Sequence, residues 1–73
     1  MPIIIQPIGI IRSHVMEQTW PWEPGMSASG LLKRLGIPEG LRAYVWLDGR
    51  RVRPDTLLKD GQVVRIVSAL AGG

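Results

Sequence analysis

Apolar residues that cluster or alternate within residues 1–22 predict two β-strands. Residues 3–6 contain three consecutive isoleucines, which is typical of a buried strand. Because Pro7 donates no ladder hydrogen bond, we expect the regular part of this strand to end near Gln6 or to continue through a bulge. A second strand is predicted over residues 15–22, with one face favoured for burial, formed by Met16, Gln18, Trp20 and Trp22.

A helix is predicted over residues 28–35 by apolar side chains spaced i, i+3, i+4 and i+7. These side chains form one stripe, made of Ala28, Leu31, Leu32 and Leu35. Ser27 stands where its hydroxyl can accept hydrogen bonds from the first backbone amides, and Gly36 stands where a helix ends. Lys33 and Arg34 in the last turn suit the negative end of the helix dipole.

The second half of the sequence predicts a hairpin, a short tucked segment and a last strand. Residues 42–47 alternate, and Asp48-Gly49 is a strong signal for a two-residue turn into residues 50–53. A tucked segment follows over residues 57–61, and the last strand is predicted over residues 62–67. Two strands, a helix across them and three returning strands describe a small α+β roll.

The composition limits what a chain of 73 residues can do by itself. There is no cysteine and one histidine, His14, so the chain offers no thiolate nucleophile, no disulfide and no histidine cluster. We therefore expect no bound cofactor or metal, no catalysis by this chain alone, and a solvated His14. The sequence has no secretory signal and no apolar span of about 20 residues, so we expect a cytoplasmic protein without a membrane partner.

The last two residues, Gly72 and Gly73, have no side chains to pack and impose no backbone preference. Together with residues 47–52, 55–64 and 69–71, they resemble the ubiquitin-like sulfur-carrier family of MoaD and ThiS. In that family a hairpin with Asn-Gly or Asp-Gly precedes the pattern D-x-x-L-x-D-G-D-x-V, a strand and a final Gly-Gly. The resemblance covers essentially the whole chain.

The resemblance implies a fold and a division of the chain. The fold is the ubiquitin-like β-grasp, an α+β fold in which one main helix packs across a mixed sheet. The domain would span residues 1–67, and residues 68–73 would form a flexible diglycine tail. Residues 8–12 are similar to the family's Phe-Gly-x-x-Arg element. Ile8 stands where the family usually has a phenylalanine, and Arg12 stands at the position of the arginine.

The resemblance also implies a carrier protein, not an enzyme. An ATP-dependent, ubiquitin-activating-like adenylyltransferase of the MoeB or ThiF type would adenylate the carboxylate of Gly73, and a sulfur donor protein would convert it to a thiocarboxylate. A C-terminal carboxyl has a pKa of about 3.3–3.7, so it is ionised at neutral pH and resists nucleophiles until activated. Residues 69–73 can extend about 16 Å, and this tail includes Leu70, Ala71 and Gly72.

The resemblance favours one biosynthetic pathway and its partner protein and leaves two alternatives open. The Gly-x-x-Arg element favours molybdopterin or tungsten-pterin cofactor synthesis with a large synthase subunit of the MoaE type. Thiamin thiazole synthesis with a ThiG-type synthase and a modifier joined to lysines remain alternatives. Trp46 or Leu58 with Ala69 and Leu70 could anchor a partner. The predicted partner contacts are Ile8, Arg12, Leu58, Ala69, Arg50, Arg51 and Arg53.

The net charge of +3 and the pI near 10.2 keep a different class open, a small basic RNA-binding module. The whole excess lies from Arg42 onward, where six basic residues face three acidic ones. Arg50, Arg51 and Arg53 in the hairpin are consistent with two roles: keeping the edge of the sheet in solvent, or binding an acidic partner surface. Residues 47–52 followed by residues 58–64 also resemble the RNA-binding domain of ribosomal protein S four and the TGS domain of larger proteins. The first domain needs two basic helices before the hairpin, whereas this sequence predicts one mostly apolar helix. Nucleic acid is therefore the less favoured partner.

Overall fold

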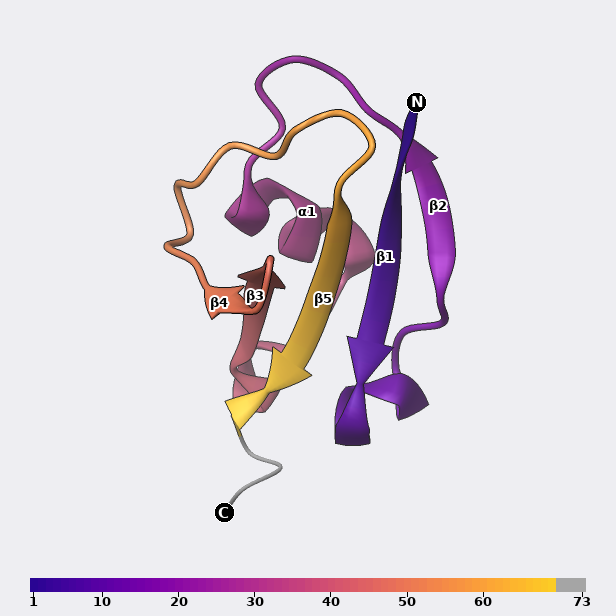
Figure 1. Cartoon of the computed structure of the whole chain (residues 1–73). Helices are drawn as coiled ribbons and strands as arrows, with labels where there is room; N and C mark the ends of the chain where they lie inside the picture. Colours follow the sequence, from indigo (N-terminus) through magenta and orange to yellow (C-terminus); the bar gives the residue numbers. More distant parts are fainter. Residues whose placement is uncertain (70–73) are drawn as a thin grey trace.

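Within residues 1–69, five strands form one mixed sheet in the order β2-β1-β5-β3-β4, and one α-helix crosses one of its faces (Figure 1). The structure is a computed structural model that describes residues 1–69. Within that range the elements are β1 Pro2–Ile8, η1 Gly9–Ser13, β2 Gln18–Pro21, α1 Ala28–Leu35, η2 Glu39–Leu41, β3 Ala43–Leu47, β4 Arg50–Arg51 and β5 Val63–Ser68, where η marks a short 3-10 helix. The predicted α+β class and the predicted order of strands and helix are confirmed.

Strand β1 continues through Pro7 without a bulge, contrary to both alternatives that the sequence suggested. It pairs in parallel with β5 in an unbroken register from Ile4 to Ile8. The Ile4 amide donates to the Gln62 carbonyl on the β5 side at 3.0 Å, so the alternation of a strand turns the Pro7 nitrogen toward the other edge. Strand β2 has already ended there, because its pairing with β1 stops at Ile5. Proline therefore costs the sheet no hydrogen bond.

Strand β2 is shorter than predicted, and the first residues assigned to it form a turn. The chain leaves β1 through η1, and the Val15 amide donates to the Ile11 carbonyl at 3.0 Å, with both side chains buried. Met16, predicted on the buried face, is 79% exposed. Trp20 and Trp22 pack against the core, as predicted.

Helix α1 begins and ends at the predicted residues. The Ser27 hydroxyl accepts a hydrogen bond from the Gly30 amide at 3.1 Å, and Gly36 adopts the left-handed conformation that ends the helix, with φ of 70°. Ala28 and Leu31 are buried, and the other two residues of the predicted stripe pack at the margin of the core.

The hairpin forms at the predicted turn, but its second strand is short. Asp48 and Gly49 both have positive φ, 51° and 79°, which is the requirement of a type I′ turn. Only Arg50 and Arg51 pair regularly, and the pairing is extended by a hydrogen bond from the Val52 amide to the β3 backbone at 3.0 Å.

Strand β5 reaches one residue beyond the predicted end. Ser68 is 2% exposed, and its hydroxyl donates to the Leu41 carbonyl. The Ala69 amide donates to the Arg42 carbonyl at 3.1 Å. In the described part of the chain no helix is long and apolar enough to cross a membrane.

Candidate functional site

The two faces of the sheet have different surroundings. Helix α1 packs on one face, whose buried side chains are Ile3, Ile5, Val45, Leu47, Val64 and Ile66. Because side chains alternate along each strand, the opposite parity points away from the helix. We call that side the open face; its central residues are Ile4, Gln6, Ile8, Tyr44, Trp46, Val63, Arg65 and Val67. Figure 1 views the molecule from this face, with α1 behind the sheet.

The open face carries large apolar side chains that residues 1–69 leave partly exposed. Ile8 is 43% exposed, and Trp46 and Val63 are each 36% exposed. Ile8, Trp46 and Val67 line a hollow of about 290 Å³ together with Arg65. A clustered apolar surface of this kind, with a charged group at its margin, is typical of a protein-binding site.

Ile8 and Arg12, two residues of the element similar to Phe-Gly-x-x-Arg and both predicted partner contacts, lie together at one end of this face. Gly9, with φ of 76°, turns the chain from β1 into η1 and thereby brings Arg12 near Ile8. The two residues line a second hollow of about 410 Å³, to which Glu17 also contributes. Both side chains are exposed. Their contact with a partner stays a prediction.

The predicted tail begins at the same end of the sheet. Ile8 and Val67 are paired residues of the parallel strands β1 and β5, and Ala69, which is exposed, lies two residues further along the chain. Because β5 is the central strand, Ala69 follows the end of the middle strand of the sheet (Figure 1). The predicted tail residues Leu70, Ala71, Gly72 and Gly73 lie outside the described residues.

The prediction of Leu58 as a partner contact is wrong. Its side chain is 3% exposed and belongs to the hydrophobic core. The Leu58 amide donates to the Met26 carbonyl at 2.8 Å, and its carbonyl accepts from the Trp22 indole at 2.8 Å, so this segment is bound on both sides. The neighbouring Leu57 is 61% exposed. The two leucines point in opposite directions, and the sequence did not show which one lies inside.

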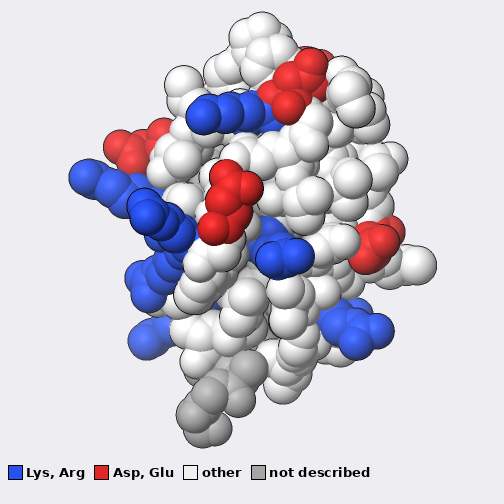
Figure 2. Space-filling view, in the orientation of Figure 1, with Lys and Arg blue, Asp and Glu red and all other residues white. Residues whose placement is uncertain are grey.

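The three hairpin arginines lie at the β4 edge of the sheet, separated from β5 by β3. The Arg51 guanidinium lies over the Tyr44 ring, 3.7 Å from its centroid. Arg53 forms an ion pair with Asp55 at 3.6 Å, and both side chains are largely exposed. Figure 2 shows basic side chains gathered along this margin of the open face, over β4 and the loop after it. Solvation of the edge and binding of an acidic partner both fit this placement.

His14 is exposed as predicted, and its Nδ1 atom lies 2.9 Å from the Ser13 hydroxyl. Among residues 1–69 no group of three or more histidine, aspartate or glutamate side chains is placed to hold a metal ion.

The sequence did not indicate that side chains of β5 form part of the open face. Val63, Arg65 and Val67 point outward, while the residues between them point to the core. The alternation was available in the sequence. Valine occurs at both parities of this strand, however, so the pattern did not indicate which parity faces the helix.

This arrangement, a mixed sheet crossed by one helix with a central last strand, is the ubiquitin-like β-grasp fold. A family model described as the ThiS family matches residues 8–73. The chain belongs to the ThiS family, which confirms the resemblance to MoaD and ThiS and places it in the class of small, non-enzymatic sulfur-carrier proteins.

A solved structure supports the fold. A protein proposed to be molybdopterin converting factor subunit 1, from Pyrococcus furiosus, superposes with a TM-score of 0.73 at 19% sequence identity. The match covers 93% of this chain and 97% of that one, so the two folds correspond over nearly their full lengths. A search of curated protein sequences finds no significant match.

Proposed function

We propose that this protein carries sulfur on its C-terminal carboxyl group for the synthesis of a cofactor. The observation that carries the proposal is the match of the ThiS family model through Gly73. The structure adds support, because Ala69, the last described residue, is exposed at the end of the central strand. An exposed residue at the end of the last strand allows a terminal carboxyl group to reach another protein's active site.

The proposed chemistry takes place at the Gly73 carboxylate in three steps. The carboxylate oxygen attacks the α-phosphorus of ATP, which an activating enzyme of the MoeB or ThiF type binds, and pyrophosphate leaves. The outer sulfur of a persulfide on the donor protein then attacks the acyl adenylate, a carbon–sulfur bond forms and AMP leaves, and a thiol cleaves the remaining sulfur–sulfur bond, which frees the thiocarboxylate and forms a disulfide. This chain contributes the acyl group and holds no cofactor of its own. Gly72 and Gly73 have no Cβ that would obstruct a narrow channel.

The body of the protein would present that carboxyl group by docking through the open face. Ile8, Trp46 and Val67 supply exposed or partly exposed apolar surface next to the strand that leads to Ala69. Apolar and aromatic side chains of this kind dominate binding energy when a partner buries them. Arg12 lies beside Ile8 and supplies a charge at the margin of the same surface. We propose the activating enzyme and a synthase subunit as successive partners of this face.

Between pathways we favour molybdopterin or tungsten-pterin synthesis, with a MoaE-type subunit as acceptor, because of the Gly9-x-x-Arg12 element. Thiamin thiazole synthesis with a ThiG-type acceptor is the second candidate, which the match to a family named ThiS supports. Both pathways place the protein in the cytoplasm.

Isotope exchange between pyrophosphate and ATP tests the adenylation step. Activating enzymes of the MoeB and ThiF types are each incubated with ATP, labelled pyrophosphate and this protein. We expect label to enter ATP only when the intact protein is present, and not when Gly73 is deleted. Lys59→Ala, which removes an exposed charge elsewhere and leaves the tail unchanged, serves as the matched control. Exchange that is independent of Gly73 would contradict the proposal.

A further inference from the structure

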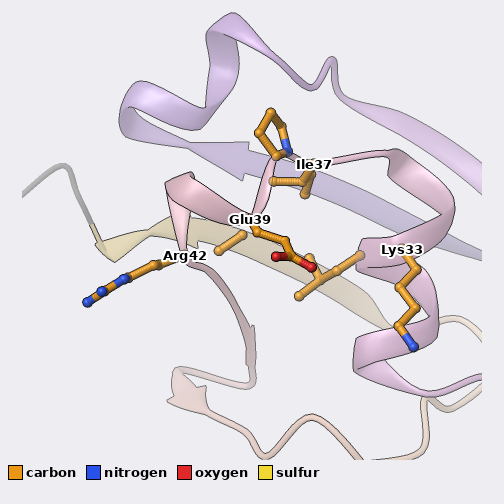
Figure 3. A pocket seen from close by; sticks show the side chains of 7 residues that line it. Lys33, Ile37, Glu39 and Arg42 are labelled. Atoms are coloured by element: carbon orange, nitrogen blue, oxygen red, sulfur yellow. The ribbon is translucent and has the colours of Figure 1, made fainter.

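A groove runs between helix α1 and the outer edge of strand β3, on a different side from the open face. It consists of two hollows, of about 410 and 290 Å³, that share Leu32 from the helix and Ala43 from the strand. The floor is mainly apolar, with Ile37 at one end and Val52 at the other. Figure 3 shows the first end, where Lys33 extends from α1 and Glu39 extends from η2. We call this feature the α1–β3 groove.

The edge of β3 beside this groove has backbone groups without a neighbouring strand. The Arg42 carbonyl accepts from Ala69 on the β5 side, and the Val45 carbonyl accepts from Val52 on the opposite side. The alternation of hydrogen bonds therefore turns the amide and carbonyl of Ala43 outward, away from β5. Strand β4 pairs only with the last two residues of β3, so within residues 1–69 no strand covers this part of the edge.

The chain bounds the groove at both ends. The Ser29 amide donates to the Pro54 carbonyl at 2.9 Å, which joins the loop after β4 to the start of the helix. At the opposite end residues 36–42 connect the helix to the strand, and the Arg42 amide donates to the Glu39 carbonyl at 3.0 Å. A chain segment could enter from the side, along the outer edge of β3 at Ala43. An unpaired strand edge beside an apolar groove is the usual site for adding a peptide as an extra strand.

The rim of the groove is predominantly basic. Its charged lining residues are Lys33, Glu39, Arg42, Arg51 and Arg53, four cations against one carboxylate. Outside the lining, Asp55 partly offsets Arg53 through an exposed ion pair. Arg42 has φ of 48°, a conformation that costs free energy for residues other than glycine, asparagine and aspartate. The Arg42 side chain begins at the groove and extends outward from it, whereas the Glu39 carboxylate points toward the other lining side chains (Figure 3).

We propose that the α1–β3 groove binds an extended acidic segment of a partner protein, which adds to β3 as a further antiparallel or parallel strand. Its backbone pairs with the free amide and carbonyl of Ala43. Apolar side chains at every second position pack against Leu32 and Ile37, and acidic side chains between them face the basic rim. The groove shares no lining residue with the hollow formed by Ile8, Trp46 and Val67, so the segment can bind while another partner contacts that hollow.

The test is an NMR titration of the isotopically labelled full-length protein with a synthetic peptide. The peptide alternates valine and glutamate over about eight residues, a common strand length, and its ends are acetylated and amidated. We expect amide shifts to centre on residues 32–33 and 43–45. A peptide of alternating valine and lysine serves as the charge control and is expected not to bind.

Backbone pairing is tested with two N-methylated versions of the peptide. Methyl groups on every second amide block either the amides that face β3 or those that face solvent. We expect the first version to lose binding and the second to retain it. Equal loss in both versions, or no shifts with the unmodified peptide at millimolar concentration, would overturn the proposal.

The basic rim is tested with Arg42→Gly combined with Lys33→Ala. Glycine suits the positive φ at position 42, so the double variant is expected to stay folded, which its own NMR spectrum verifies. We expect the peptide to bind about fivefold more weakly, since two exposed charge contacts are lost, and the Lys59→Ala control to bind unchanged. Shifts centred on Trp46 would place the peptide on the open face, and a dimer through the β3 edge in sedimentation would make a second copy the occupant; either result overturns the proposal.

Discussion

Leu57 and Leu58 are adjacent in sequence but differ in exposure, and truncating each of them tests the packing of the core. Leu58 is 3% exposed and belongs to the core cluster, whereas Leu57 is 61% exposed. Leu58→Ala removes buried methyl groups and leaves a cavity, a change that costs about 2–5 kcal/mol of unfolding free energy. Leu57→Ala removes a side chain that is mostly in water and should change stability by no more than about 0.5 kcal/mol.

The cost at Leu58 is large for a domain of this size. A domain with one small core has a net stability of only a few kcal/mol, so the variant is expected to be partly unfolded at room temperature. One kcal/mol shifts the melting midpoint of such a domain by roughly 4–8 °C. The expected decrease is therefore about 8 °C or more for Leu58→Ala and about 4 °C or less for Leu57→Ala.

Thermal unfolding followed by tryptophan fluorescence measures both variants, because Trp20 and Trp22 pack against the core. The Trp22 indole donates to the Leu58 backbone carbonyl, which the substitution leaves in place, so the signal reports on lost packing. Equal midpoints for the two variants, or a larger decrease for Leu57→Ala, would refute the assignment of Leu58 to the core.

Three further substitutions test the helix cap, the hairpin turn and the open face. Ser27→Ala removes the acceptor for the Gly30 amide and should cost about 1 kcal/mol in urea unfolding, whereas Ser27→Gly should cost a few tenths. Gly49→Ala forces a side chain onto a φ of 79° and should cost about 1 kcal/mol, with Gly40→Ala as the milder control. Ile8→Ala should weaken binding to the activating enzyme about fivefold in calorimetry without lowering the melting midpoint by more than a few degrees; unchanged affinity would exclude Ile8 from the interface.

The helix and the hairpin turn were predictable because their signals are local. Ser27 and Gly36 bracket one apolar stripe, and the side-chain cap and the left-handed residue formed where the sequence placed them. A two-residue hairpin turn of type I′ requires positive φ at both positions, and Asp48 and Gly49 both adopt it. These signals depend on neighbours within a few residues.

The errors concern features that depend on distant parts of the chain. Proline was expected to interrupt β1, but its effect depends on which neighbouring strand is present at position 7, and β2 has already ended there. The assignment of Leu58 to the surface failed because two adjacent leucines offer no pattern, and only the packing against Trp22 and the core decides which one is buried.

The candidate site was predicted in part. The sequence placed Ile8 and Arg12 in one short element and among the partner contacts, and the structure places them around one hollow at the end of the sheet where Ala69 lies. The contribution of Val67 and Arg65 depends on which parity of β5 faces the helix. The α1–β3 groove depends on the shortness of β4, which no residue pattern in the hairpin indicated.

Intact mass measurement of the protein tests the central claim most directly. The full chain is incubated with ATP, a MoeB-type or ThiF-type activating enzyme, a persulfide-bearing sulfur donor and a thiol reductant that cleaves the acyl disulfide, and its mass is compared before and after. We predict the mass increase of one oxygen-to-sulfur exchange, lost when Gly73 is deleted and retained in Lys59→Ala. An unchanged mass with both types of activating enzyme, under conditions in which each loads its own known carrier, would contradict the sulfur-carrier function.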